Sequence, residues 1–469
     1  MMRNRKLIAI LVLSVLLRIA AALYMGNTVV PLPGAFDQVS YHTLALRVLD
    51  GHGFTFGQTW WPATAAGEPT AHWSFLYTGY LVAVYALFGV QPLIARLIQA
   101  VLVGLLQPYL AYRLARQLFD ADSEHRTSTA PGWSRWLHDN LPLLAAAITA
   151  GYIYFFYYAA ALMTEPFYFV AILASLSLTI SLARRREGHT RLALMLGLAL
   201  AAAVLLRQLY LLFVPFLLLW LLLAQYRQHR WTDSLRPIAD SVRPIAISVG
   251  LVVLVILPIT AFNYSRFDRF VLLNTNAGFA FYLANHPFYE DSFIPASEMD
   301  SRYRELIPDE LRDLNEAALD QALLQRGLQF VVDDPGRYLR LSLSRIPDYF
   351  RFWPESASGM LSNASRLLSF GLFLPFMIIG VAHRLLARAR EARRSLLAAL
   401  AAPDTLLLLF ILVYTGIHVL SWTQVRYRLP VDAVLVLFAA LGLANAATVI
   451  GRLTWTTGHK AEPADPLSS

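Results

Sequence analysis

Residues 141–186 read LPLLAAAITAGYIYFFYYAAALMTEPFYFVAILASLSLTISLARRR. Two apolar runs, at about 141–162 and 165–183, are joined by the short link Met163-Thr164-Glu165-Pro166 and followed by three arginines. Because a helix needs roughly 20 apolar residues to cross a bilayer, each run is long enough to be a membrane span. Loops rich in Lys and Arg stay in the cytoplasm. The stretch therefore predicts a helical hairpin with its arginines inside and Glu165 outside.

The same alternation of apolar runs and basic clusters continues along the whole chain. Six places rich in Arg and Lys occur at every second gap, so we predict that they are cytoplasmic and that the gaps between them face out. The basic clusters are Arg3/Arg5/Lys6, Arg113/Arg116/Arg126, Arg184/Arg185/Arg186/Arg191, Arg227/Arg230/Arg236/Arg243, Arg384/Arg388/Arg390/Arg393/Arg394 and Arg452/Lys460. The predicted spans are residues 6–26, 92–113, 141–162, 165–183, 192–206, 209–225, 245–262, 366–383, 403–421 and 430–451.

We therefore expect an all-α, polytopic integral membrane protein with about 10 transmembrane helices. The first outer loop, residues 27–91, holds two amphipathic stretches, at 41–49 and 74–90. If 74–90 were a span, the arginines after 165–183 would lie outside, so we predict that it is a helix in the outer membrane interface. The pair 192–206 and 209–225 is short and could instead form a hairpin that does not fully cross. The predicted modules are an N-terminal transmembrane module (1–262), a periplasmic helical segment (263–365), C-terminal transmembrane helices (366–456) and a polar cytoplasmic tail (457–469).

The long external segment has a composition of its own. Residues 264–365 contain 15 Asp and Glu against 10 Arg, so acidic groups are in excess outside. Helical periodicity runs through 306–330. The sequence Asp333-Asp334-Pro335-Gly336 then predicts a turn before another amphipathic helix at 337–350. The segment is predicted to be a helical cap on the outer face.

The overall composition fits a membrane protein and excludes other classes. Hydrophobic residues make up 57% of the chain, charged residues 15%, and the mean hydropathy of +0.50 is beyond that of an ordinary soluble domain. The net charge of +8 does not indicate nucleic-acid binding, because the arginines form separate clusters at span ends. With no cysteine, disulfides and thiolate metal sites are excluded. No small-residue cleavage site follows the first apolar run, so we expect an uncleaved first span.

Two carboxylates are expected at the outer ends of the spans. Asp37 precedes the helix predicted over 38–49, and it is a helix N-cap, a general base for an acceptor hydroxyl or an oxygen ligand of a divalent cation. Glu165 begins a span, where an acid suits the positive end of the helix dipole. An ionisable residue between two apolar runs is also typical of a functional site. Both are candidate catalytic residues, and they are the candidate ligands if a metal is needed.

Three arginines are predicted at the same outer face. Arg207 interrupts an apolar run, and an unpaired arginine in the hydrocarbon would cost at least ~2.5 kcal/mol, so it must be paired or lie at a mouth. Arg426 and Arg428 precede the last span in a short outer loop, where positive charge is disfavoured. Guanidinium groups bind phosphate oxygens in a bidentate manner. We predict that the three arginines bind a donor phosphate; contact with lipid headgroups is the alternative.

Other outer residues are candidates for contact with a sugar or an acceptor. The histidines are scattered, without a close pair such as His-x-x-x-His, so a histidine metal site is not predicted. The Tyr and Trp residues are mostly typical of an interfacial belt, but part of them could stack on a sugar ring. The candidate contacts are Tyr41, His72, Trp73, Asn285 and His286.

Several short motifs occur in a recognisable order along the spans. They are Asp37 followed by Tyr41, Ala45, Leu49 and Gly51-x-Gly53, the aromatic stretch 73–89, Arg96, Thr164-Glu165, Leu206-Arg207, Asn263, Phe270-Val271, Thr275, Gly278, Asn285-x-Pro287 and Arg426-Tyr427-Arg428-x-Pro430. This order resembles the GT-C glycosyltransferases, nearest the subgroup with the protein O-mannosyltransferases and the lipid A aminoarabinose transferase. The resemblance implies a sugar donor on a polyprenyl phosphate and transfer on the outer face. It implies that Asp37 activates the acceptor or binds a metal, and that Glu165 is the second-loop acid. The chain departs from the family at Gln38, where many members have Glu, and at Ala71-His72-Trp73, where many have a proline pair.

The sequence thus predicts an inverting glycosyltransferase of a bacterial inner membrane, with its site facing the periplasm. Expected partners are a polyprenyl-phosphate-linked sugar donor, a glycan, lipid or protein acceptor, and membrane lipids, but no nucleic acid. No cofactor is predicted apart from an optional divalent cation. One alternative is an oligosaccharide ligase or polymerase, whose diphosphate donor would need more positive charge outside. The other is a non-enzymatic lipid-linked saccharide flippase, which would need a polar path through the bilayer centre.

Overall fold

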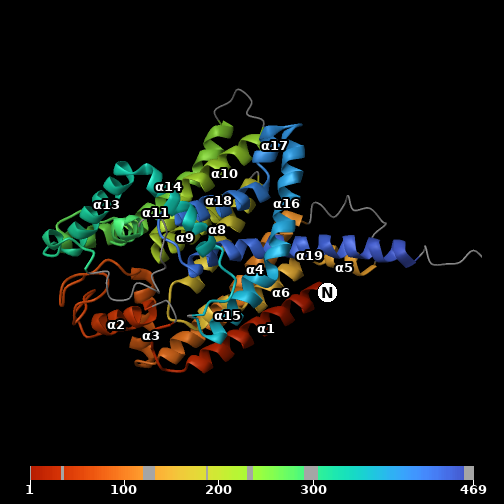
Figure 1. The fold of residues 1–469 in the computed structure, drawn as a ribbon. Helices are drawn as coiled ribbons and strands as arrows, with labels where there is room; N and C mark the ends of the chain where they lie inside the picture. The colour runs from red at the N-terminus through yellow and green to blue at the C-terminus, as the bar shows by residue number, and fades with distance from the viewer. Residues whose placement is uncertain are drawn as a thin grey trace, which may run out of the picture.

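The computed structural model describes residues 2–32, 36–119, 132–185, 189–229, 236–289, 305–356 and 358–458. Regular structure in these ranges is helical, apart from isolated bridges of Thr55 with Pro69 and of Trp60 with Thr64. Long helices form a bundle, and α2 (Asp37–Leu49), α3 (Phe75–Phe88), α13 (Glu316–Asp333) and α14 (Pro335–Tyr349) lie toward one end of it (Figure 1). The predicted all-α class is confirmed. The predicted polar tail lies, from residue 459 on, outside the described residues.

Nine helices and one bent pair of helices in the described ranges are long and apolar enough to cross a membrane. Their number and order agree with the ten predicted spans, and the chain is a multi-pass membrane protein. The spans are α1 (Met2–Met25), α4 (Pro92–Phe119), α6 with α7 (Leu141–Gly151 and Ile153–Ala160), α8 (Glu165–Ala183), α9 (His189–Leu206), η2 with α10 (Gln208–Leu212 and Val214–His229), α11 (Arg236–Phe267), α15 with α16 (Met360–Arg366 and Leu372–Ala392), α18 (Pro403–Leu420) and η8 with α19 (Val425–Arg428 and Leu429–Gly458).

The span predicted over 141–162 is not one straight helix. It bends by 50° between α6 and α7, which frees backbone groups at the break. Arg18 of α1 is fully buried and donates to the carbonyl oxygens of Thr149 (3.5 Å) and Ala150 (3.4 Å), and the Tyr154 N–H donates to Ser369 Oγ (3.4 Å). Broken helices persist in membranes where neighbouring groups satisfy the freed backbone. The buried Arg18 therefore has a structural role.

Helices α16 and α19 pack closely because each presents a glycine to the other. A Cβ added at Gly380 of α16 would lie 1.9 Å from the carbonyl oxygen of Phe438, and one added at Gly442 of α19 would lie 1.9 Å from that of Phe376. Small residues allow this approach, and in a membrane such packing is a main source of helix association. The crossing anchors the last span, which begins beside the candidate site.

The first outer loop contains α2 (Asp37–Leu49) and α3 (Phe75–Phe88). Ser74 caps α3 by accepting a hydrogen bond from the Tyr77 N–H (3.2 Å). At 14 residues, α3 rises only about 21 Å, less than the roughly 30 Å of a hydrocarbon core. It is therefore shorter than a span, in agreement with the prediction for 74–90.

Helices α12 (Ala277–Asn285), α13 (Glu316–Asp333) and α14 (Pro335–Tyr349) form the cap. They share a hydrophobic cluster separate from the main core, which includes Leu283, Leu323 and Leu341. The helix predicted within 306–330 begins later, because Asn315 caps α13 by accepting from the Ala318 N–H (2.9 Å). Asp334 caps α14, so the predicted turn at 333–336 contains the start of the helix. Residues 290–304 of the predicted cap lie outside the described residues.

Candidate active site

Both candidate carboxylates lie at the N-terminal ends of helices. Asp37 is the first residue of α2, where Phe36 occupies the N-cap position. Glu165 is the first residue of α8, after Thr164. The capping alternative for Asp37 is wrong, because Asp37 is inside the helix and its carboxylate accepts a hydrogen bond from Arg426. An acidic side chain at this position complements the positive end of the helix dipole.

Four of the predicted residues meet in one ion-pair cluster. Arg426 Nη1 donates to Asp37 Oδ2 and lies 3.9 Å from Glu165 Oε1. Arg207 Nη2 lies 2.5 Å from the same Glu165 oxygen. The Glu165 side chain is 2% exposed, whereas those of Asp37 and Arg207 are 22% and 21% exposed. Arg426 thus connects an accessible carboxylate with a buried one, and the cluster of two acids and two arginines has no net formal charge.

Neighbouring side chains hold the two arginines in place. Arg207 Nε donates to Thr164 Oγ1 (3.3 Å), and Arg426 Nε donates to Gln424 Oε1 (2.7 Å). The ring of Tyr427 lies near both, 5.3 Å from the Arg207 guanidinium carbon and 5.2 Å from that of Arg426. Cations over an aromatic face are stabilised by its quadrupole. The two guanidinium groups are therefore preorganised side by side.

Gln38, the residue after Asp37, is held in place by Arg96. The sequence analysis did not predict this role. Gln38 Oε1 accepts from Arg96 Nη2 (3.2 Å) and from the Leu162 N–H (3.4 Å). Arg96 Nη1 also donates to the carbonyl oxygen of Gly26 (2.7 Å) at the end of α1. These bonds tie the starts and ends of three helices together. The signal in the sequence was the arginine at position 96, inside the predicted span 92–113. Only the family resemblance had singled it out.

Tyr41 lies beside the ion-pair cluster. Its hydroxyl oxygen accepts from the Ser74 N–H (3.3 Å), and its ring packs edge-on against Trp73. Burial raises the pKa of Tyr41. The charge of Arg207 lowers this pKa, and the charge of Glu165 raises it. The phenol is therefore protonated at neutral pH. Tyr41 stays a candidate for contact with substrate.

His72 and Trp73 lie at the junction of the first outer loop with the cap. His72 Nδ1 is 3.2 Å from the carbonyl oxygen of Thr275, and the ring packs edge-on against Trp61. Burial lowers the pKa of His72, although the nearby Glu316 opposes this shift, so a neutral imidazole is favoured. Trp73 is 5% exposed, and its indole N–H has no hydrogen-bond partner among the described residues. Their predicted contact with sugar or acceptor stays a prediction.

Asn285 has a structural role at the end of α12, so its prediction as a substrate contact is wrong, whereas that of the half-buried His286 stays a prediction. Asn285 is 1% exposed, and its side-chain oxygen accepts from Arg345 Nη2 (3.0 Å). His286 Nδ1 accepts from the Phe288 N–H (3.1 Å). The Asn285 side chain therefore serves the internal structure of the cap. The spacing of both residues matched the family, but the polar atoms of Asn285 face the protein.

Arg428 does not join the cluster, and its prediction as a phosphate ligand is wrong. It is fully buried, and its Nε lies 3.0 Å from Asp432 Oδ1. Its Nη1 donates to the carbonyl oxygens of Tyr349 (2.8 Å) and Arg351 (3.2 Å). Tyr152 donates to the other carboxylate oxygen of Asp432 (2.8 Å). Arg428 therefore attaches the end of the cap to the last span.

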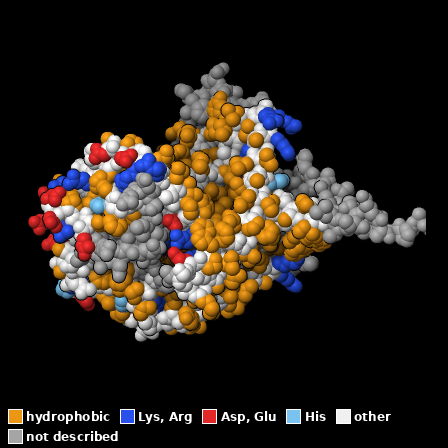
Figure 2. Space-filling view, in the orientation of Figure 1, with side chains coloured by type: hydrophobic (Ala, Val, Ile, Leu, Met, Phe, Trp, Pro, Cys, Tyr) orange, Lys and Arg blue, Asp and Glu red, His pale blue; other side chains and the backbone are white. Residues whose placement is uncertain are grey.

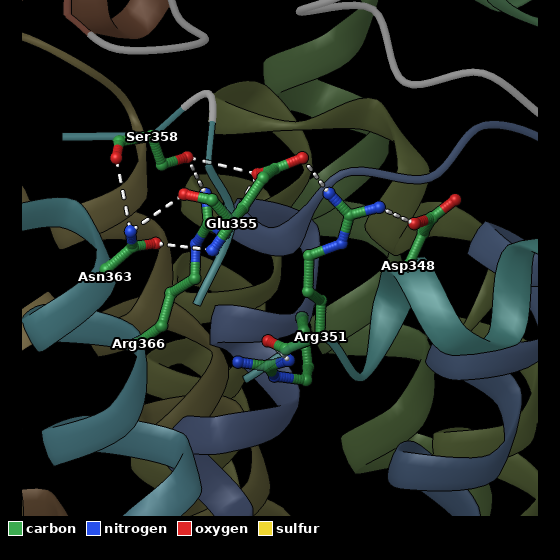
Figure 3. A network of polar contacts seen from close by, with 7 residues as sticks. Asp348, Arg351, Glu355, Ser358, Asn363 and Arg366 are labelled. Atoms are coloured by element: carbon green, nitrogen blue, oxygen red, sulfur yellow. Dashed lines mark hydrogen bonds and ion pairs between the residues drawn. The ribbon is translucent and has the colours of Figure 1, made fainter. Parts of the chain in front are cut away.

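The segment that Arg428 contacts is itself held by a polar network (Figure 3). Arg351 pairs with Asp348 and with Glu355 (2.6 Å), and Arg366 pairs with the second oxygen of Glu355 (3.0 Å). Ser358 and Asn363 complete the network through hydrogen bonds to Glu355. Each guanidinium in it has an acidic partner. The network ties Glu355, which lies between α14 and α15, to residues just after α14 and in α15.

In this arrangement both carboxylates contact arginines, and the optional divalent cation stays a prediction. Mg²⁺ and Ca²⁺ are bound by six or more oxygen ligands. Asp37 and Glu165 are each paired with an arginine, and the described residues contain no group of three or more His, Cys, Asp or Glu able to hold a metal.

No protein-family model and no curated protein matches the sequence. Among solved structures, the apo oligosaccharyltransferase of Archaeoglobus fulgidus aligns with 99% of this chain at a TM-score of 0.57 and 16% identity. The AglB oligosaccharyltransferase of the same organism, in complex with an inhibitory peptide and a dolichol-phosphate, aligns with 99% of this chain at a TM-score of 0.54 and 16% identity. The chain has the GT-C fold. This confirms the fold expected from the resemblance.

The fold similarity covers only part of the oligosaccharyltransferases. The chain spans about half of their length, 53% and 52% for the two structures. ArnT from Cupriavidus metallidurans, bound to undecaprenyl phosphate, also aligns with 98% of this chain and 81% of its own, at 14% identity. Its TM-score of 0.34 is too low to carry a conclusion.

Proposed function

We propose that this chain is a glycosyltransferase that moves a sugar from a polyprenyl-phosphate donor to an acceptor hydroxyl at the outer face of a bacterial inner membrane. The observation that carries the proposal is the ion-pair cluster of Asp37, Glu165, Arg207 and Arg426. It combines the partly exposed carboxylate of Asp37 with two guanidinium groups at one end of a helix bundle. A base and a phosphate-binding pair are the groups that this transfer needs.

The charge distribution supports an outward-facing site. On the face shown in Figure 2, acidic and basic side chains gather over the cap, while basic side chains alone mark the opposite end of the hydrophobic surface. Basic loops remain in the cytoplasm. The cap and the cluster at the start of α8 then face the periplasm.

The donor phosphate would bind between Arg426 and Arg207. Arg426 contacts Asp37 in the absence of a donor, so an incoming phosphate competes with Asp37 for this guanidinium. As Arg426 turns to the phosphate, the Asp37 carboxylate becomes free to accept a proton. Glu165 is buried and holds Arg207, so its proposed role is to position that arginine. Dolichol-phosphate accompanies one oligosaccharyltransferase of the same fold, which supports a lipid phosphate as the ligand.

The reaction then follows from these positions. Asp37 takes the proton from the acceptor hydroxyl, whose oxygen attacks the anomeric carbon from the side opposite the phosphate. The new C–O bond forms as the bond between the anomeric carbon and the phosphate oxygen breaks, which inverts the configuration. Polyprenyl phosphate leaves with the bonding electron pair, and the two arginines offset the added negative charge. Stabilising charge that develops in the transition state is usually the largest contribution to catalysis.

The test compares Asp37→Asn with Glu68→Gln, an exposed acid in the same outer loop. A deletion strain should lack one glycoconjugate, identified by glycolipid and glycan analysis. We expect wild type and Glu68→Gln to restore it, and Asp37→Asn to fold, insert and show a loss of about 10²–10⁴-fold, the usual contribution of a general base. Full activity of Asp37→Asn would contradict the assignment of Asp37. A deletion strain with unchanged glycans would contradict the function.

A further inference from the structure

A second candidate site lies at the opposite end of the bundle from the ion-pair cluster. A cavity of about 320 Å³ opens where the ends of α8 and α10 meet the start of α18. It is lined by Ile180, Ala183, Arg184, Trp220, Ala224, Arg227, Ala401 and Pro403. The 19 residues of α8 place this end about 28 Å from Glu165, nearly the thickness of a hydrocarbon core. The cavity therefore lies at the other membrane surface.

Its polar groups suit an anion. Trp220 is 4% exposed, and its indole N–H has no hydrogen-bond partner among the described residues. Arg227 lies two turns further along α10, on the same side, and its Nη1 donates only weakly to the Ala398 carbonyl oxygen (3.4 Å). Arg184 donates to the carbonyl oxygen of Gln117. These groups are donors, and a buried indole N–H without an acceptor costs free energy until a ligand supplies one.

The neighbouring acid does not neutralise the cavity. Asp404 follows Pro403 in α18 but is 1% exposed, and its Oδ2 lies 2.7 Å from Arg384 and 3.3 Å from Arg388. The surface that continues from the cavity along α10 is apolar and faces lipid, with Phe216 43% and Leu219 64% exposed. A cationic recess beside an exposed apolar helix fits a molecule with an anionic head and acyl chains.

We propose that this cavity binds the phosphodiester headgroup of an anionic phospholipid from the leaflet opposite the ion-pair cluster. Arg227 and Arg184 contact the phosphate oxygens, the Trp220 N–H donates to one of them, and the acyl chains lie along α10. The bound lipid joins the ends of three spans, including α8, whose other end carries Glu165. The proposal does not depend on glycosyl transfer.

The test measures lipid binding to the full-length protein in detergent by native mass spectrometry. The probes are phosphatidylglycerol and phosphatidylcholine with matched acyl chains. We expect preferential retention of phosphatidylglycerol, weakened about tenfold or more in Trp220→Phe and in Arg227→Gln, as for the loss of a charge-assisted hydrogen bond. Arg393→Gln, at an exposed basic residue outside the cavity, should bind like wild type. Circular dichroism of each variant verifies that it remains folded.

Two results would overturn the proposal. Equal retention of phosphatidylglycerol by wild type and the folded double variant of Trp220 and Arg227 would show that the cavity is not the lipid site. Displacement of phosphatidylglycerol by inorganic phosphate at similar concentrations, with no preference for the lipid, would identify a site for free phosphate instead.

Discussion

Replacement of Arg426 by alanine tests its proposed role as a ligand of the donor phosphate in the ion-pair cluster. Arg426 is the residue that touches Asp37 and lies 3.9 Å from Glu165, and its side chain is only 12% exposed. A hydrogen bond to a charged group contributes about 1.5–3 kcal/mol. Its loss should therefore lower kcat/KM for the polyprenyl-phosphate sugar by roughly 10- to 150-fold. Arg426→Lys should recover only part of the activity, because a point charge cannot reproduce the two parallel hydrogen bonds of a guanidinium.

The assay follows release of polyprenyl phosphate from a labelled donor by protein reconstituted in liposomes. Arg326→Ala is the control, since Arg326 is half-exposed on the cap and pairs with an exposed glutamate. Exposed pairs contribute little, so this variant should behave like wild type. Wild-type kcat/KM in a folded Arg426→Ala protein would refute the assignment of Arg426 to the donor phosphate.

Three further predictions concern stability. Arg428→Ala leaves Asp432 buried without its partner and should cost about 3–5 kcal/mol of unfolding free energy, seen as a lower Tm in detergent; an unchanged Tm would contradict the structural role. Gly380→Ala should cost about 1–3 kcal/mol because its Cβ meets the backbone of α19, whereas Gly416→Ala, with open space around it, should not lower the Tm. Burial raises the pKa of Asp320 from 3.8 to about 6, so the folded state favours the neutral carboxyl. The protonated carboxyl therefore contributes to the free energy of unfolding at low pH, and this contribution is lost as pH rises from 4 through 6. Asp320→Asn should remove about 3 kcal/mol of that pH dependence, and an identical slope of Tm between pH 4 and 7 in both proteins would count against it.

The spans were predictable because they depend on local properties of the chain. The length of an apolar run decides whether a helix crosses the bilayer, and the position of arginines decides its direction. Run length and arginine position can both be read from the sequence without knowledge of any tertiary contact. The bend between α6 and α7 was not predictable, because it depends on Arg18 and Ser369 from distant helices.

The candidate site was predictable only in part. Parity placed Asp37, Glu165 and three arginines on one face, but it could not separate Arg426 from Arg428. These two belong to the short 3-10 helix η8, in which residues two apart point in different directions. One reaches Asp37, 389 residues away along the chain, and the other turns into the protein.

The sequence by itself therefore determined the helical class and the spans, and the side of the membrane on which the charged residues lie stays a prediction. Only the tertiary structure decided which charges pair and which polar residues are internal, as for Arg428 and Asn285. The physical reason is that membrane insertion is decided segment by segment by transfer free energy. Ion pairing depends on the separation of atoms within a few ångströms, which is set by the packing of helices far apart in the chain.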